Sequence, residues 1–437
     1  MELGYALTVA AVNLWDRRIG AVAQDGPGEA AIFEYVPEFA SAGVEVAPLQ
    51  MPVNRSRYRF PALAFESFRG LPGMLADSLP DDFGNAVIDA WLARQGRAPE
   101  SFNAVERLCY IGRRGMGALE FAPAVGPSTR HSESLEVAAL VELAGEVLAQ
   151  REGLHTSLSD ASGADGLREI LLVGSSAGGA RAKAVIAYDP LSGAVRSGQL
   201  DVPDGFGHWI LKLDGVDTHR EIGGTHGYGA IEYAYALMAR EAGIEMTECR
   251  LLDEGGRRHF MTRRFDRNGN EKIHMQSLAA LAHFDFRKAG AYSYEQALLV
   301  IRELGMSAAA VEQQFRRAVF NIVARNQDDH VKNIAFLMDR SGRWSLSPAF
   351  DLTYAYNPRG VWTASHQMTL AGKREAFTLT DLRACARSAS LARTAPARVL
   401  ADVVAAVTQW RRFAADAGVE EGVAKAIAST HRLALAT

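Results

Sequence analysis

Residues 321–356 read NIVARNQDDHVKNIAFLMDRSGRWSLSPAFDLTYAY, and this stretch decides the fold. Two apolar runs, Ile334–Met338 and Trp344–Leu346, flank the sequence Asp339–Gly342. A turn rich in Asp, Ser and Gly between two apolar runs is typical of a β-hairpin. We therefore expect a short antiparallel pair at this point, inside a region that otherwise has helical periodicity.

Polar residues frame the predicted hairpin on both sides. Asp328 and Asn333 precede it and Asp351 follows it, so we expect the three side chains to gather at one end. Phosphoryl transfer needs such a set, because one carboxylate orients the attacking hydroxyl while an amide and a second carboxylate hold Mg²⁺. The alternative is that Asp328, Asp329 and Asn333 only cap turns, where Asp and Asn are common.

Composition bounds the class of protein. The chain has 437 residues, 48% hydrophobic and 22% charged, which suits a globular protein of one to three domains with a large core. A net charge of −4 argues against nucleic acid as the main ligand. We expect no membrane association, because no apolar run approaches the length of a membrane span.

The cysteines and the start of the chain predict a cytoplasmic location. Cys109, Cys249 and Cys385 lie far apart and are odd in number, so we expect reduced, buried thiols and no zinc site. The opening residues lack the basic segment of a signal peptide.

The first third of the chain mixes strands and helices. We expect strands at Val9–Trp15, Ile19–Ala23 and Ala31–Tyr35, and a helix over Asp81–Trp91. Residues 108–121 have the pattern of a Gly-rich turn that ends in a strand. Arg113 and Arg114 there are predicted to be solvated surface residues, with contact to a phosphate or an acidic partner as the alternative.

A second glycine-rich segment follows at 170–189, with the sequence ILLVGSSAGGARAKAVIAYD. It predicts a strand, a loop and a second strand, the order that folds over nucleotide phosphates in protein kinases. The loop residues are Ser175, Ser176, Ala177, Gly178 and Gly179, whose backbone N–H groups could donate to phosphate oxygens. A plain hairpin turn is the alternative.

A lysine lies within an apolar strand further on. Lys212 stands within the apolar strand predicted at Trp209–Leu213. Burying an unpaired charge in such a strand costs roughly several kcal/mol. Lys212 must therefore reach solvent or an anionic partner. Glu232 lies near the start of a helix predicted at Ala230–Ala242, and a strand lysine paired with a helix glutamate aims the lysine at the phosphates of ATP.

The second half of the chain is mainly helical. A hairpin is predicted first, from residues 249–253 and 259–266, and helices follow at Tyr294–Leu304, Ala308–Ala324, Leu379–Ala386, Ala395–Ala415 and Val419–Leu433. A β-rich half followed by an α-rich half predicts an α+β, two-lobed architecture with its polar chemistry at the junction.

Taken together, these segments resemble the HipA family, the serine/threonine-kinase toxins of bacterial toxin–antitoxin pairs. The resemblance spans nearly the whole chain. In the first third it is carried by LWDRRIGAV, LADSLPDDFG and YIGRRGMGALEF, and later by SSAGGARAK, WILKL, RRFDR, DDHVKN and PAFDL. It implies a protein-kinase-like fold with a HipA N-terminal subdomain at 1–125, a linker and helix at 126–166, an N-lobe at 167–265 and a helical C-lobe at 266–437.

The resemblance also implies roles for individual residues in an enzyme that uses ATP and Mg²⁺. Asp328 matches the catalytic aspartate, Asn333 and Asp351 match the metal ligands, and Lys212 with its partner Glu232 matches the ATP-phosphate lysine. The remaining matches concern the nucleotide: residues 175–179 form the loop over ATP, Arg263 and Phe265 lie where the hinge meets adenine, and Ser176 (or Ser175) is the autophosphorylated serine.

Autophosphorylation in the loop would inactivate the kinase, because a phosphate adds nearly two negative charges where the ATP phosphates should lie. The target implied by the family is a cytosolic protein, an aminoacyl-tRNA synthetase, whose modification slows translation and growth. The implied partner is a HipB-like antitoxin, which would make most of the contact with DNA. One departure from ordinary protein kinases is His330, which stands where they have a lysine, while Lys332 follows two residues later.

Two other functions fit parts of the pattern. A small-molecule kinase would share the two-lobed core, but it would not need the serine pair in the loop. A non-enzymatic subunit that binds an antitoxin and helps it repress DNA is the other, although every catalytic position is filled.

Overall fold

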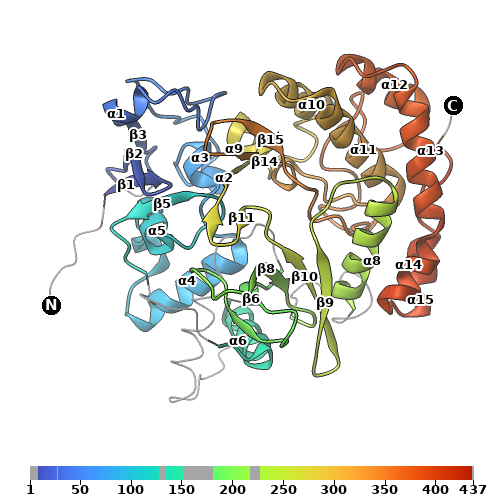
Figure 1. Ribbon diagram of the computed structural model, residues 1–437, viewed down its shortest axis with the longest axis horizontal. Coiled ribbons are helices and arrows are strands. Elements are labelled where there is room, and N and C mark those ends of the chain that lie inside the picture. Colours follow the sequence, from blue (N-terminus) through green and yellow to red (C-terminus); the bar gives the residue numbers. More distant parts are fainter. Residues whose placement is uncertain (1–7, 27, 127–133, 152–180, 217–226, 436–437) are drawn as a thin grey trace.

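The computed structural model describes residues 8–26, 28–126, 134–151, 181–216 and 227–435. It has an α+β architecture with two lobes and an additional N-terminal unit built on its own sheet (Figure 1). The glycine-rich loop 175–179 and the strand expected at residues 170–173 lie outside the described residues.

The N-terminal unit is built on a five-stranded antiparallel sheet in the order β4-β3-β2-β1-β5. Its strands are β1 (Val9–Leu14), β2 (Arg17–Ala23), β3 (Ile32–Tyr35), β4 (Arg57–Tyr58) and β5 (Leu119–Ala122). Burial alternates along β1, so one face of the sheet packs on the core and the other faces outward. The tight β1–β2 turn places Trp15 and Asp16 at positive φ, as a two-residue hairpin loop requires.

Helices fill the rest of this unit: α1 (Pro37–Ala40), α2 (Phe65–Phe68), α3 (Gly73–Ala76), α4 (Asp82–Arg94), η1 (Pro99–Ser101) and α5 (Ala104–Ile111). Two predictions here are wrong. Residues 108–111 are the end of α5 and not part of a turn, because Asn103 and Glu106 form a capping box that starts a helix there. Arg114 is buried, and its guanidinium donates to the carbonyls of Tyr110 and Ile111, whereas Arg113 is largely exposed.

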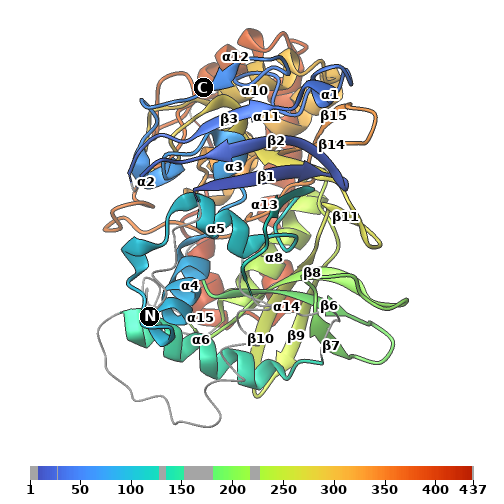
Figure 2. The same ribbon diagram turned by 90° about the vertical axis from the view of Figure 1, so that its left-hand side faces the viewer.

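The N-lobe contains a second five-stranded sheet in the order β7-β6-β8-β10-β9. Its elements are β6 (Lys183–Tyr188), β7 (Val195–Ser197), β8 (Gly207–Lys212), β9 (Cys249–Glu254) and β10 (Arg257–Arg263), with helices α6 (Val137–Arg151) and α8 (Tyr228–Glu241). Figure 2 shows this sheet below the N-terminal sheet and separate from it. Helix α8 contacts both this sheet and the C-terminal helices, so it joins the two lobes.

The C-lobe combines two small sheets with packed helices, most of which Figure 1 shows at the right. One sheet pairs β11 (Arg267–Asn268) with β12 (Glu271–Lys272), and the other contains β13 (His274–Ser277), β14 (Ala335–Met338) and β15 (Trp344–Leu346). The helices are α9 (Leu278–Ala282), α10 (Tyr294–Glu303), α11 (Ala308–Ala324), η2 (Val331–Asn333), α12 (Leu379–Ser388), α13 (Ala395–Thr408), α14 (Trp410–Ala417) and α15 (Glu421–Ala428).

The predicted hairpin is confirmed as β14 and β15, and β13 adds a third strand to it. The single helix expected over Ala395–Ala415 is two helices, because the chain turns at Gln409 between α13 and α14. That turn lets Trp410 pack against Tyr235 of α8, with ring centroids 5.2 Å apart.

Candidate functional site

A cleft of about 1090 Å³ lies where the N-terminal unit, the N-lobe and the C-lobe meet. Its wall combines apolar side chains with a high density of charge. The lining residues include Ile210, Met246, Phe260, Phe265, Met275 and Leu352 among the apolar ones, and Lys183, Lys212, Glu232, Arg263, His330, Lys332, Asn333 and Asp351 among the polar ones. Such a wall suits a ligand with one flat apolar part and one anionic part.

Lys212 is the centre of the charged group. Its ammonium Nζ lies 2.6 Å from Glu232 Oε1 on α8 and also hydrogen-bonds Asp351 Oδ1. Burial by itself would lower the pKa of Lys212, but the Asp351 and Glu232 carboxylates outweigh burial and raise that pKa. The lysine is therefore charged at neutral pH, and the predicted Lys212–Glu232 pairing is present.

The carboxyl group of Asp351 is largely buried and nevertheless ionised. Burial would raise the pKa of its carboxyl, yet the Lys212 ammonium holds that pKa at about 2, so the group is an anion at any physiological pH. Its φ of 53° lies in the left-handed region, which costs a non-glycine residue about 1 kcal/mol or more. Strain of this kind persists where the surrounding structure imposes it, as at binding sites.

The two adjacent aspartates of the DDH sequence face in different directions. Asp329 is buried, and its carboxylate accepts hydrogen bonds from Tyr294 Oη (2.6 Å), His366 Nδ1 (2.8 Å) and the Gln367 backbone (2.7 Å). The Asp328 side chain is 51% exposed, with Oδ1 3.9 Å from His330 Nε2. Asp329 thus anchors the loop, and the turn-capping alternative describes it well, whereas Asp328 is left accessible.

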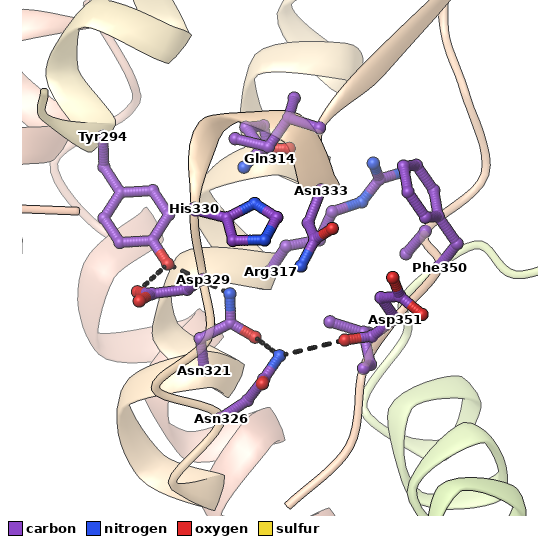
Figure 3. Close-up of a pocket in the computed structure, with 13 residues that line it drawn as sticks. Tyr294, Gln314, Arg317, Asn321, Asn326, Asp329, His330, Asn333, Phe350 and Asp351 are labelled. Atoms are coloured by element: carbon purple, nitrogen blue, oxygen red, sulfur yellow. Dashed lines mark hydrogen bonds between the residues drawn. The ribbon is translucent and has the colours of Figure 1, made fainter. Parts of the chain in front are cut away.

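Asn333 and Asp351 are brought together as predicted, but Asp328 lines neither the cleft nor the smaller cavity that these two residues share. Asn333 and Asp351 line the same cavity, and Figure 3 shows both beside Phe350. The link to Asp328 is through the backbone, because Asn333 Nδ2 donates to the Asp328 carbonyl at 2.9 Å. This bond fixes which end of the Asn333 amide faces the loop and leaves its oxygen for another partner.

The hinge segment, residues 263–266, has an exposed first side chain and two fully buried ones. Arg263 ends β10 with its side chain 57% exposed, while the ring of Phe265 lines the cleft 5.6 Å from the ring of Phe350. Arg264 and Asp266 are fully buried and paired at 2.7 Å. The hinge is therefore anchored by its buried ion pair, and its cleft face is largely apolar.

The N-terminal unit also forms part of the cleft, which the sequence reasoning missed. Asp77, Ser78 and Met116 line it. Asp77 accepts hydrogen bonds from the backbone and hydroxyl of Ser277 in the C-lobe, at 2.7 and 2.8 Å, and Asp81 lies 3.2 Å from Lys183 in the N-lobe. One short segment thus contacts both lobes, and the available signal was the run of acidic residues in LADSLPDDFG.

The residues present fit a divalent cation that is bound mainly through a nucleotide. Within the described ranges, His, Cys, Asp and Glu side chains do not gather in threes as a self-contained metal centre. Mg²⁺ commonly takes only one or two protein carboxylates together with substrate phosphates. The Asp351 carboxylate and the Asn333 amide oxygen supply oxygen ligands of that kind, next to the lysine that would face the phosphates.

Two regions of the chain match known protein domains. Residues 10–122 match the HipA N-terminal domain, and residues 175–411 match the HipA-like C-terminal domain. The chain belongs to the HipA family. The predicted family and the predicted two-lobed kinase-like fold are thereby confirmed.

Two curated relatives carry the name "Putative kinase". The one from Sinorhizobium fredii is 28% identical over 201 residues, covering 42% of this chain and 47% of the relative. The one from Haemophilus influenzae is 26% identical over 134 residues, covering 28% of this chain and 39% of the relative. The chain therefore spans less than half the length of either relative.

A solved structure shares the fold of this HipA-family chain. The HipA toxin of Shewanella oneidensis, determined with HipB and operator DNA, superposes with a TM-score of 0.65 at 16% identity. The match covers 96% of this chain and 94% of the other. Among the helices that the structure describes, none is long and apolar enough to cross a lipid bilayer.

Proposed function

We propose that this protein is an ATP- and Mg²⁺-dependent kinase that transfers the γ-phosphoryl group to Ser or Thr of a cytosolic protein. The observation that carries the proposal is the cluster of Lys212, Glu232 and Asp351 on the wall of a nucleotide-sized cleft. A strand lysine held by a helix glutamate next to a metal-binding carboxylate is the arrangement that protein kinases use on ATP phosphates.

Each residue has a defined task in this proposal. Lys212 neutralises ATP phosphate oxygens, and Glu232 keeps its ammonium in place when the nucleotide enters. Asp351 and Asn333 hold Mg²⁺, which neutralises charge that develops on the phosphates. Phe265 and the backbone near Arg263 contact adenine, and the loop of Ser175, Ser176, Ala177, Gly178 and Gly179 covers the phosphates.

Asp328 orients the attacking hydroxyl and accepts its proton. Its half-exposed side chain supports this role, because a protein hydroxyl must be able to reach it from solvent. The backbone hydrogen bond from Asn333 keeps Asp328 in register with the metal-binding side chains. The carboxylate is therefore positioned to act on a substrate that remains largely in solvent.

The transfer step is tested with labelled ATP. Purified protein is incubated with γ-labelled ATP and cell extract, and labelled proteins are identified by mass spectrometry. We expect Asp328→Asn to lower transfer about 10²–10⁴-fold, the usual contribution of a positioned base. Asp253→Asn is the matched control, since Asp253 is an exposed aspartate whose side chain is 78% accessible. Transfer that persists in the Asp328 variant would reject the assignment.

Three further parts of the proposal rest on the resemblance to the family: the target, the regulation and the protein partner. The target is an aminoacyl-tRNA synthetase, and autophosphorylation at Ser176 (or Ser175) switches the kinase off. The partner is a HipB-like antitoxin, a proposal supported by the Shewanella HipA, which was determined together with HipB and operator DNA. Phosphosite mapping of the incubated protein tests the switch, and phosphorylated metabolites without phosphoserine would favour a small-molecule kinase instead.

A further inference from the structure

Helix α11 turns a row of polar side chains toward the protein interior. Gln314, Arg317 and Asn321 are spaced three and four residues apart, so they lie on one face of the helix. Their exposed fractions are 1%, 4% and 7%. Burying polar groups is costly unless they find hydrogen-bond partners, so this row calls for an explanation.

The row faces a cavity directly behind the metal-binding side chains. Asn326, Asn333 and Asp351 form other parts of the same wall, as Figure 3 shows. The cavity measures about 330 Å³ overall, and about 20 Å³ of it is open to the centre of a water molecule. One buried water needs about 10–15 Å³ of such space.

Four buried polar atoms of this wall have no hydrogen-bond partner within the part of the chain that the structure describes. They are Gln314 Oε1, Arg317 Nε, Asn326 Oδ1 and His330 Nδ1, a ring nitrogen that can donate or accept. The two amide oxygens need a donor, whereas the guanidinium N–H needs an acceptor. A single ligand can satisfy them only if it both donates and accepts hydrogen bonds.

The charges around the cavity favour a neutral ligand. Arg317 is charged at neutral pH, since burial lowers its pKa only to about 10, and its cation opposes a bound metal ion. The carboxyl groups of Asp329 and Asp351 line the same space, which opposes a bound anion. Water meets the hydrogen-bonding requirement and carries no charge.

We propose that this cavity is a buried-water site anchored by Gln314, Arg317 and Asn326, and that the bound water positions Asp351 for its metal ion. The second half of this statement rests on the function proposed above. The link runs through Asn326, whose Nδ2 donates to Asn321 Oδ1 at 3.0 Å and to the Asp351 carbonyl at 3.4 Å. Water bound to Asn326 Oδ1 fixes the amide from its other end and thereby supports the left-handed backbone of Asp351.

The water site is tested directly on the wild-type protein. A crystal structure at high resolution should show ordered water within hydrogen-bond distance of at least two of Gln314 Oε1, Arg317 Nε and Asn326 Oδ1. A dry cavity, or density for an ion in this space, would overturn the water site. This test needs no variant and no catalytic activity.

The positioning role is tested with a matched pair of variants, Gln314→Met and Gln313→Met. Methionine keeps nearly the volume of glutamine but loses its hydrogen bonds. Gln313 is the adjacent residue on the same helix, and its amide bonds the Gly243 carbonyl and the Glu245 backbone away from the cavity. The measurement is Mn²⁺ affinity, by electron paramagnetic resonance in the presence of a non-hydrolysable ATP analogue.

We expect Gln314→Met to weaken Mn²⁺ binding about tenfold, the lower end of the usual cost of losing a group that supports a metal ligand. Gln313→Met should leave the affinity unchanged, and thermal unfolding establishes that both variants are folded. A Gln314→Met protein that has lost the water but binds Mn²⁺ as the wild type does would overturn the positioning role. A wild-type protein that binds no Mn²⁺ would overturn that role together with the proposed function, whereas the crystal structure decides the water site separately.

Discussion

Two groups of buried charge flank the hinge, and they differ in how completely the protein satisfies them. The Asp266 carboxylate accepts four hydrogen bonds, from Arg264 Nε and Nη2, Arg267 Nη1 and the Gly117 backbone, at 2.6–2.9 Å. Oδ1 accepts one of these bonds and Oδ2 accepts the other three. Both oxygens of Asp266 are thus occupied by protein donors, and the bond from Gly117 joins the hinge to the N-terminal unit.

The Lys212 group is less completely buried and opens onto the cleft. Asp351 and Lys212 keep side-chain exposures of 22% and 16%, against 0% for Arg264 and Asp266. Burial and perturbed pKa values are common to both groups, so they do not by themselves identify a site. The Lys212 group differs because a ligand can reach its charged side chains. A charged group of the ligand can then take the place of one of their partners in the protein.

The largest effect we expect is on stability, from Asp266→Ala. This change leaves two arginines buried side by side, and breaking a buried ion pair in this way costs about 3–5 kcal/mol. The measurement is the free energy of unfolding from urea denaturation. A loss below about 1 kcal/mol, the value typical of exposed pairs, would show that this ion-pair cluster does not anchor the hinge.

Asp351→Asn should give the opposite result, a large loss of activity with little loss of stability. Glu232 still neutralises Lys212 in this variant, so the fold keeps its charge balance. Removing one preorganised charge from a phosphoryl-transfer site lowers the rate about 10²–10³-fold. Transfer of labelled phosphate and the unfolding midpoint are measured on the same preparation, and equal transfer rates in variant and wild type would remove Asp351 from the site.

Lowering the pH from 7 toward 4 should reduce the free energy of unfolding through buried histidines before it changes the charge of Asp351 in the cleft. Burial lowers the pKa of His274 to about 4 from 6.5, so the unfolded chain takes up a proton first as the pH falls. His274 therefore contributes stability above about pH 6.5 that is lost toward pH 4, about 3 kcal/mol in total. Asp351, with a pKa of about 2, stays ionised over this range.

The measurement is the free energy of unfolding at several pH values between 7 and 4.5. Replacing His274 with Gln should reduce the slope of stability against pH by about 1.4 kcal/mol per unit near pH 5, since one titrating group is gone. An unchanged slope would mean that His274 is already protonated in the folded protein. His283 and His431, whose pKa values burial also lowers to about 4, contribute to the remaining slope, as do His208 and His259, whose pKa values burial lowers as well.

The smallest effect is expected from Arg263→Ala at the exposed end of the hinge. Its guanidinium is 4.0 Å from Glu248 and largely in solvent, where an ion pair contributes about 0–1 kcal/mol. Hinge contacts with adenine are mostly made by the backbone, so the KM for ATP should stay within about twofold, a difference below 0.5 kcal/mol. A KM raised tenfold would give this side chain a direct role in nucleotide binding.

The sequence predicted which strands and helices carry the site residues better than it predicted which of their side chains are exposed. The hairpin β14–β15, the strand that carries Lys212 and the helix that carries Glu232 all follow from local periodicity and turn chemistry. Asp328 and Asp329 are adjacent and chemically identical, yet one is half-exposed and the other is the buried anchor of Tyr294 and His366. No local pattern separates them, because the partners of Asp329 come from segments 35 and 37 residues away.

By itself, the sequence determined the strands and helices that carry the site residues, the family, and the pairing of a strand lysine with a helix glutamate, since these depend on spacing along one chain. Only the tertiary structure decided that Asp77 and Met116 of the N-terminal unit line the cleft, that Arg114 is buried, and that α11 turns Gln314 and Arg317 toward a cavity behind Asp351. These features depend on which surfaces meet after folding. Burial and the pKa values that follow from it arise from contacts between distant segments, and residue order does not encode them locally.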